Sequence, residues 1–193
     1  MPPPRGFLNE TLPGQPAPSW MEATLQPPPE RSRLTGEISV DVGIVGAGYA
    51  GLSAALTLAE RGVSVAVLEA HRVGWGASGR NGGHLDSLPR REIAFFERTM
   101  GVEDARAIVH AARDAAKLVR RRIREHAIDC DLTDGAVEVH HRRRFDAEAE
   151  DAVATLAERY GIGGLEFLPP ARLTDWVRAE GLFGGVLHRE SGS

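Results

Sequence analysis

The residues best suited to chemistry are three glycines and an acid with a characteristic spacing. Gly46, Gly48 and Gly51 fit the pattern G-x-G-x-x-G, and Glu69 follows the last of them by eighteen residues. Such glycines allow a tight turn, a close approach of the backbone to a pyrophosphate, and close packing of a helix on a sheet. A carboxylate at this spacing accepts hydrogen bonds from ribose hydroxyls. The spacing predicts a dinucleotide site, and an acid at position 69 favours a free 2′-hydroxyl, as in FAD or NAD.

The flanking residues predict the elements that would position this motif. Residues 38–45 are largely apolar and β-branched, as in a strand buried on both faces. From 49 to 61 small and apolar residues recur at helical spacing, and Gly62 is placed to end that helix. Residues 63–68 indicate a second buried strand, which ends directly before the acid. The order strand, glycine turn, helix, strand and acid is typical of a dinucleotide-binding βαβ unit.

The uncharged stretch 42–59 is also long enough to be considered as a membrane span. Four glycines fall in its first ten residues, however, and the charges of Asp41 and Glu60 close it at its two ends. We therefore expect no membrane span. The net charge of −4 gives no reason to expect a nucleic-acid partner.

The segment after the acid is unusually rich in glycine. Five glycines lie from Gly74 to Gly83, interleaved with Ser78, Arg80 and Asn81. Such a loop offers backbone N–H donors, a hydroxyl and a guanidinium. An isolated glycine run would be interpreted as a surface loop, and an NAD domain would normally continue into a crossover helix here.

The combination of GAGYAGLSAALTLAERG (46–62) with VAVLEAHRVGWGASGRNGG (65–83) resembles a known family. It is similar to the FAD-dependent oxidoreductases of the D-amino-acid oxidase superfamily, and more narrowly to the gamma-glutamylputrescine oxidase-like amine oxidases. Three further segments share the likeness: Ser19-Trp20, Ile128–Asp131 and Gly184–Ser191.

The resemblance implies FAD as the cofactor. The ADP half would lie on the three glycines of the first motif and on Glu69, and the glycine-rich loop would follow the pyrophosphate and the isoalloxazine ring. Arg72 would either touch the adenosine or be a solvated surface arginine. The full set of expected cofactor residues is Gly46, Gly48, Tyr49, Ala50, Gly51, Glu69, Ala70, Arg72, Ser78, Arg80, Asn81, Gly82 and Gly83.

The resemblance also implies the reaction. A hydride would pass from a carbon bearing a neutral amine to flavin, and the imine would hydrolyse. The partners would be a small-molecule amine or amino acid and oxygen. An alternative is a flavin dehydrogenase that uses an electron carrier. No catalytic residue is identified, no metal is expected, and His84 is the one histidine that we single out for testing.

We expect an α/β fold with a Rossmann-like FAD-binding βαβ unit and the start of an α+β substrate domain, incomplete in this chain. The expected division is a proline-rich arm (1–36), the FAD-binding domain (37–128) and the beginning of the substrate domain (129–193). The chain would be an N-terminal fragment of a longer enzyme. The alternative is a remnant that binds FAD weakly or not at all.

Beyond the loop, the pattern predicts a helix at 103–127, a turn at Asp134-Gly135 and a strand at 136–140. A helix at 146–160 would be capped by Asp146 and stopped by Gly161, and a strand at 166–168, a helix at 171–178 and a strand at 183–187 would follow. The apolar stripe expected on the first of these helices is Ile108, Ala112, Ala115, Val119 and Ile123. The arginines expected to form its solvated face are Arg120, Arg121, Arg122 and Arg124.

The single cysteine, Cys130, excludes an intramolecular disulfide and fits a reducing, cytoplasmic location. We expect it to be a small buried core residue. No signal peptide is recognisable, because the first thirty residues are rich in proline and have no apolar core. Trp20, Met21 and Leu25 would either pin this arm to the body or be exposed.

Overall fold

The computed structural model describes residues 19–25 and 31–193. The chain divides into two compact units, Met1–Gly82 and Gly83–Ser193. This division places residues 83–128 with the second unit, whereas the sequence suggested a domain boundary after 128. Compact units of this chain need not coincide with the domains of a longer protein, so the boundaries at 36 and 128 stay a prediction.

Most of the expected proline-rich arm lies outside the described residues. The part that the structure describes contains a short helix, α1 (Trp20–Thr24). The side chains of Trp20, Met21 and Leu25 are all exposed. Of the two alternatives for these residues, exposure is therefore the one observed.

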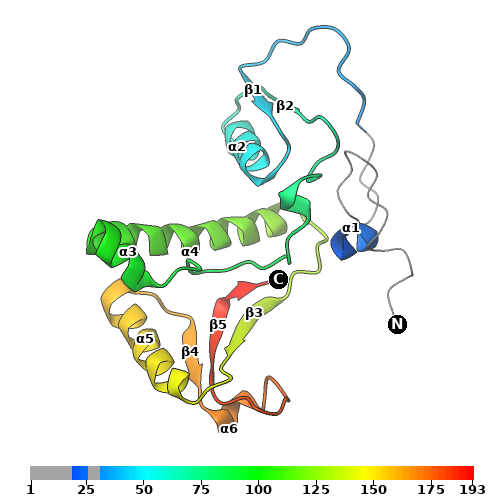
Figure 1. Ribbon diagram of the computed structural model, residues 1–193. Coiled ribbons are helices and arrows are strands. Elements are labelled where there is room, and N and C mark those ends of the chain that lie inside the picture. The colour runs from blue at the N-terminus through cyan, green and yellow to red at the C-terminus, as the bar shows by residue number, and fades with distance from the viewer. Residues whose placement is uncertain (1–18, 26–30) are drawn as a thin grey trace. The chain divides into compact units, whose positions relative to one another are not determined.

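The first unit is the expected βαβ unit, shown in Figure 1. It comprises β1 (Val42–Val45), α2 (Tyr49–Ala59) and β2 (Val65–Leu68). The two strands are parallel, and α2 packs against both of them. Gly62 has a φ of +78° just past the helix, in the left-handed region that glycine adopts readily. The predicted helix, its stop signal and both strands are confirmed. The prediction that the strands are buried on both faces is wrong: Val45 is 89% exposed and neither strand has a buried residue, because the described part of this sheet has two strands with α2 on one face.

Both strands are shorter than predicted. The parallel pairing begins at Val42, opposite Val65. Just before it, the Asp41 carboxylate accepts the N–H of Ser64 at 3.0 Å, and the N–H of Asp41 donates to the Ser64 carbonyl at 3.1 Å. This side-chain contact closes the start of the strand pair, so residues 38–41 remain outside the sheet.

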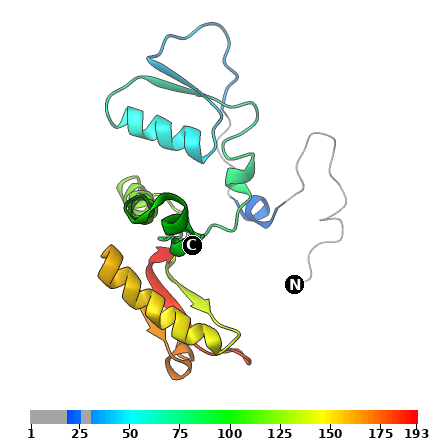
Figure 2. The same ribbon diagram turned by 60° about the vertical axis from the view of Figure 1, so that its left-hand side comes forward.

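The second unit combines helices with an antiparallel sheet (Figure 1). Its strands have the order β3-β5-β4, with β5 in the middle and antiparallel to both neighbours. The turned view of Figure 2 shows α5 lying across the sheet, where it contacts β4 and β5. Its elements are α3 (Ile93–Met100), α4 (Val102–Glu125), β3 (Asp134–Val139), α5 (Arg144–Tyr160), β4 (Leu165–Leu168), α6 (Pro170–Leu173) and β5 (Gly185–Gly192).

Two apolar clusters hold the second unit together. One lies between α4 and α5, and the other lies between the sheet and α6. The first contains Val109, Leu156, Tyr160 and Ile162, and the second contains Leu168, Leu173 and Leu187. Burial of this apolar area is the main favourable term that fixes the helices on the sheet.

The long predicted helix is confirmed as α4, but its inward face differs from the predicted stripe. Ala115 and Val119 belong to that stripe and are exposed. The stripe is wrong at these positions because the inward face also carries Arg113 and Arg120, which bind partners on β3 and β5. The buried residues of the helix are Ala105, Val109, Ala116 and Arg122.

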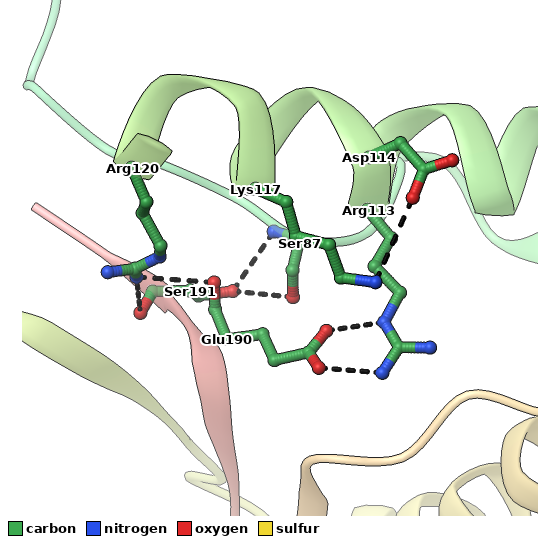
Figure 3. A network of polar contacts seen from close by, with 7 residues as sticks. All are labelled: Ser87, Arg113, Asp114, Lys117, Arg120, Glu190 and Ser191. Carbon is green, nitrogen blue, oxygen red and sulfur yellow. Dashed lines mark hydrogen bonds and ion pairs between the residues drawn. The ribbon is translucent and has the colours of Figure 1, made fainter. Parts of the chain in front are cut away.

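A polar network joins α4 to the end of β5, as Figure 3 shows. The Arg113 guanidinium donates two hydrogen bonds to the Glu190 carboxylate, at 2.5 and 2.6 Å. Arg120 donates to the backbone carbonyls of Glu190 and Ser191, at 3.2 and 2.7 Å, and also pairs with Asp134. The Ser87 N–H donates to the Ser191 hydroxyl at 3.1 Å. The network therefore joins α4 and the end of β5 to Ser87 and to Asp134 on β3.

The same network corrects the interpretation of the arginine cluster. Arg121 and Arg124 are exposed, as expected of a solvated face. Arg122 is buried, and Arg120 is held by the partners just described. The solvated-face prediction is therefore wrong for these two, because carboxylate and carbonyl acceptors from the sheet replace water around Arg120.

Asp146 does not cap α5, which already begins at Arg144. Its carboxylate instead accepts the N–H of Gly184 at 3.0 Å and contacts His140 Nδ1 at 2.9 Å. The stop at Gly161 is confirmed, with a left-handed φ of +64°. The sequence suggested a cap on the local helix. In the structure the Asp146 carboxylate instead accepts a hydrogen bond from a residue that is distant in sequence.

Four other expectations about the second unit differ from the structure. The expected turn at Asp134-Gly135 is instead an irregularity inside β3, where Gly135 has a φ of +86°. The predicted helix 171–178 is shorter, and the last strand runs on to Gly192. Cys130 is exposed, so the buried-core prediction is wrong. Helix α3 was not predicted.

Candidate functional site

The turn between β1 and α2 is built by its glycines. The N–H of Gly46 donates to the Leu68 carbonyl at 2.8 Å, which ties the turn to the end of β2. Gly46 has a φ of +98°, and nothing lies within 4 Å of the position that a Cβ would take. A Cβ on Gly51 would stand 2.0 Å from the Gly46 carbonyl oxygen. Only glycine at position 51 therefore lets α2 begin this close to the turn.

The first turn of α2 supplies backbone N–H groups that can donate hydrogen bonds to a ligand. An α-helix leaves its first N–H groups without acceptors inside the helix, and its N-terminus carries a partial positive charge. Ala50 and Gly51 lie in this first turn. Their N–H groups and the open space beside Gly46 suit a phosphate.

Glu69 follows the end of β2 and reaches back to the turn. Its Oε2 accepts the N–H of Ala47 at 2.8 Å, and its Oε1 accepts the N–H of His71 at 3.0 Å. The hydrogen bond from Ala47 lowers the pKa of the Glu69 carboxyl most, and the one from His71 lowers it further, so this pKa lies below its usual value. The group is therefore ionised at neutral pH, and each oxygen keeps acceptor capacity for a further donor such as a ribose hydroxyl.

The glycine-rich loop folds back onto the same turn. The N–H of Gly74 donates to the Ala47 carbonyl at 3.0 Å. Within the loop, a Cβ on Gly79 would stand 2.2 Å from the Gly74 carbonyl oxygen, which explains the need for glycine at that position. A short 3₁₀ helix, η1 (Ala77–Gly79), presents Ser78 to the start of α2. The loop is thus a closed structure tied to the first glycine motif.

Ser78 occupies part of the helix N-terminus. Its hydroxyl accepts the N–H of Tyr49 at 3.0 Å and lies 3.0 Å from the position of a Cβ on Gly48. Asn81 donates to the Tyr49 hydroxyl at 3.0 Å and to the Ser78 carbonyl at 2.8 Å. Arg80 Nε donates to the Trp75 carbonyl at 3.1 Å. The structure therefore brings Ser78 and Asn81 together beside the start of α2, while the Arg80 guanidinium contacts the backbone of the loop itself.

The remaining predicted residues follow the acid or lie at the end of the glycine-rich loop. Ala70 lies between Glu69 and His71, and Arg72 is half-buried, with its carbonyl accepting the N–H of Trp75 at 3.0 Å. Gly82 ends the first unit, while Gly83 and His84 open the second. The site as described is therefore the one formed within the first unit.

Two residues that help to build the candidate site were not recognised in the sequence. Ala47 uses both its N–H and its carbonyl to hold the acid and the loop, and its side chain is buried. A backbone role of this kind leaves no signal in the side-chain type. The other contributor is Trp75, whose ring stacks on that of His71. The aromatic residue inside a glycine run was a signal that could have been followed.

A parallel βαβ unit with a glycine turn at the helix N-terminus and an acid after the second strand is the arrangement typical of dinucleotide-binding folds. The chain belongs to the FAD dependent oxidoreductase (DAO) family, whose model matches residues 41–193. Both the α/β fold class and the family expected from the sequence are thereby confirmed.

The relatives narrow the comparison further. The chain is 38% identical over 165 residues to the gamma-glutamylputrescine oxidoreductase of Escherichia coli (strain K12), covering 82% of this chain and 37% of that protein. It is 36% identical over 156 residues to the probable oxidoreductase OrdL of Rhizobium meliloti (strain 1021), covering 81% and 36%. The chain thus spans little more than a third of the length of these relatives.

A solved structure shares the fold. The L-amino acid deaminase from Proteus vulgaris matches with a TM-score of 0.63 and 20% identity, covering 85% of this chain and 36% of that one. At this identity the likeness concerns the fold alone.

Two further properties belong to the described part of the chain. Within residues 19–25 and 31–193, no three His, Cys, Asp or Glu side chains gather as a metal ion would require. None of the helices in these ranges is both long and apolar enough to cross a bilayer.

Proposed function

We propose that this chain binds FAD on the β1–α2 turn, as the dinucleotide-binding part of an oxidoreductase acting on small amines or amino acids. The observation that carries the proposal is the arrangement around Gly46, where open space, the first turn of α2 and the ionised Glu69 meet. Membership of an FAD-dependent family and the likeness to a gamma-glutamylputrescine oxidoreductase support it.

The chain's own residues divide the work of binding. The N–H groups of Ala50 and Gly51 donate to the pyrophosphate, and the Ser78 hydroxyl adds a donor because its oxygen already accepts the Tyr49 N–H. Glu69 accepts hydrogen bonds from the ribose. The remaining expected residues, from Arg80 onward, follow the pyrophosphate toward the flavin.

Flavin bound at such a site supplies a hydride acceptor for the amine-bearing carbon and a route for the electrons to oxygen or to a carrier. The protein supplies orientation and electrostatics. Within this proposal the substrate is a small amine or amino acid, the location is cytoplasmic, and His84 is the histidine to substitute first because it directly follows the glycine-rich loop.

A second candidate is a protein that folds but holds FAD weakly and has no turnover. It is favoured by the small core of the first unit. Helix α2 has no buried residue, and the described strands β1 and β2 form a two-stranded sheet. Sheets usually need at least three strands, or a packed helix face, for independent stability.

The test is a titration of the purified chain with FAD, followed by flavin fluorescence and calorimetry, with ADP and FMN as competitors. FAD should bind, ADP should displace it, and FMN should bind at least about tenfold more weakly, because the proposed contacts lie on the ADP half. FMN binding as tightly as FAD, or no competition by ADP, would refute the placement. A colourless protein that ignores added FAD would support the second candidate.

A matched pair of variants sharpens the result. Glu69→Gln should weaken FAD binding about tenfold, because charged hydrogen bonds are worth about 1.5–3 kcal/mol and neutral ones less. Glu37→Gln alters another glutamate of the same unit, which is exposed. It should leave the affinity for FAD unchanged.

A further inference from the structure

Three hydrogen bonds among Tyr49, Ser78 and Asn81 form a closed triangle between the start of α2 and the glycine-rich loop. The Ser78 hydroxyl accepts the N–H of Tyr49 at 3.0 Å. The Asn81 amide donates to the Ser78 carbonyl at 2.8 Å and to the Tyr49 hydroxyl at 3.0 Å. Tyr49 precedes its two partners by 29 and 32 residues, so the triangle is a long-range contact between the helix and the loop.

The chemistry of the groups fixes the donors and acceptors of this triangle. A backbone carbonyl only accepts hydrogen bonds, so the Asn81 atom that faces the Ser78 carbonyl is the amide nitrogen. This nitrogen carries two hydrogens, and the Ser78 carbonyl and the Tyr49 hydroxyl take one each. The backbone N–H of Tyr49 is bound by the Ser78 hydroxyl. While the triangle is closed, these donors serve the protein and not a ligand.

The triangle acts on a loop that is costly to order. Five glycines lie from Gly74 to Gly83, and glycine loses more conformational freedom on ordering than any other residue. The loop is tied to the glycine turn at its start, where the Gly74 N–H donates to the Ala47 carbonyl at 3.0 Å. The triangle supplies a second tie further along the loop. A loop that is ordered beforehand loses less freedom when a ligand binds to it.

We infer that Tyr49 and Asn81 are positioning residues, which hold the glycine-rich loop against the first turn of α2 before a dinucleotide arrives. The effect on FAD rests on the proposed function, whereas the order of the loop is a property of the ligand-free chain. The family resemblance implied that both residues contact the cofactor. The triangle instead gives their donors a partner inside the protein and makes their action on FAD indirect.

Tyr49→Phe tests this role, because it removes only the oxygen that accepts the Asn81 N–H and keeps the aromatic ring. Tyr49 is 66% exposed, so water replaces the lost partner and the variant keeps its fold. Loss of one neutral hydrogen bond should weaken FAD binding about 2- to 10-fold. In the ligand-free chain the N–H groups of Gly79 and Arg80, which bond within η1 at 3.2 and 3.1 Å, should exchange with solvent faster by a similar factor.

A double-mutant cycle separates positioning from direct contact with FAD. Asn81→Ala removes both hydrogen bonds of the amide, so Tyr49→Phe should have little further effect on FAD affinity in that background. Two independent contacts with FAD would instead multiply their fold-losses in the double variant. The matched control is Thr57→Ala, which removes a hydroxyl of the same helix that donates to the Ser53 carbonyl at 2.8 Å. It should change neither FAD affinity nor loop exchange.

Calorimetry with FAD and hydrogen exchange followed by NMR give outcomes that distinguish the two proposals. Failure of the wild type to bind FAD overturns the proposed function, while exchange in the ligand-free chain still decides whether the triangle orders the loop. Unchanged exchange of the Gly79 and Arg80 N–H groups in Tyr49→Phe overturns the positioning role and leaves the proposed function intact. Fold-losses that multiply in the double variant also overturn it, because Tyr49 would then act on FAD without Asn81.

Discussion

The ion pair between Arg113 and Glu190 should contribute measurably to the stability of the second unit. The two side chains are joined by two hydrogen bonds of 2.5 and 2.6 Å, and their exposed fractions are 18% and 32%. Breaking a fully buried pair costs about 3–5 kcal/mol, whereas an exposed pair contributes about 0–1 kcal/mol. A bidentate but partly hydrated pair lies between these limits, and we expect a coupling free energy of about 1–2 kcal/mol.

A double-mutant cycle with Arg113→Ala, Glu190→Ala and the double variant isolates the coupling free energy of the pair. Hydrogen-exchange mass spectrometry across a urea series, read on peptides of α4 and β5, reports the second unit separately from the first. The matched control is Arg121 with Glu125 on the same helix, a pair at 3.6 Å whose side chains are 53% and 56% exposed. Its coupling should be no more than about 0.5 kcal/mol.

The pH dependence of stability gives a second measure of the Arg113–Glu190 ion pair. Hydrogen bonds from Arg113 hold the pKa of the Glu190 carboxyl below its usual value. The folded-state pKa is therefore lower than the unfolded value of about 4.3. The stabilisation is complete above that unfolded value and is lost as the pH falls through the folded-state pKa. A coupling no larger than that of the control pair, or one unchanged on acidification, would refute this account.

Two other predictions concern the second unit. Asp146→Ala leaves the Gly184 N–H and His140 without their carboxylate and should destabilise the protein by about 1–3 kcal/mol, whereas Asp151→Ala on the exposed face of α5 should cost under about 0.5 kcal/mol. Equal melting temperatures for the two variants would contradict this. Cys130 is exposed, so the native protein should react with one equivalent of a thiol reagent as fast without denaturant as with it. A thiol that reacts only after unfolding would show that the loop is covered.

The βαβ unit could be predicted from the sequence because its signals are local. The glycines around Gly46, the helix stop at Gly62 and the apolar strands all lie within about thirty residues and depend on neighbours in the chain. Gly161 ended its helix as predicted for the same reason. The family resemblance rested chiefly on residues 46–83, which overlap this unit and continue into the glycine-rich loop.

The inward face of α4 could not be predicted in this way. The sequence assigned Arg120 to a solvated face, but its guanidinium donates to the carbonyl of Ser191, 71 residues later in the sequence. Asp146 was interpreted as a local cap and instead binds the N–H of Gly184, 38 residues away. Long-range pairing of charged groups reverses their expected burial, and no pattern in one segment reports it.

The site shows the same limit. The residue types around the turn were foreseen, and their roles toward a cofactor stay a prediction. The contact of Ser78 with the Tyr49 N–H and the double use of Ala47 depend on how the loop folds back. Backbone donors and acceptors are alike in every residue, so the sequence cannot tell which of them meet.

The two hydrogen bonds of Glu69 have a consequence for engineering. An acid at this position is the usual target when cofactor preference is redirected toward a 2′-phosphate, because a basic residue is put in its place. Here that exchange would also strip an acceptor from the N–H groups of Ala47 and His71. A redesign for NADP-like ligands would therefore have to install a substitute acceptor for this corner along with the new positive charge.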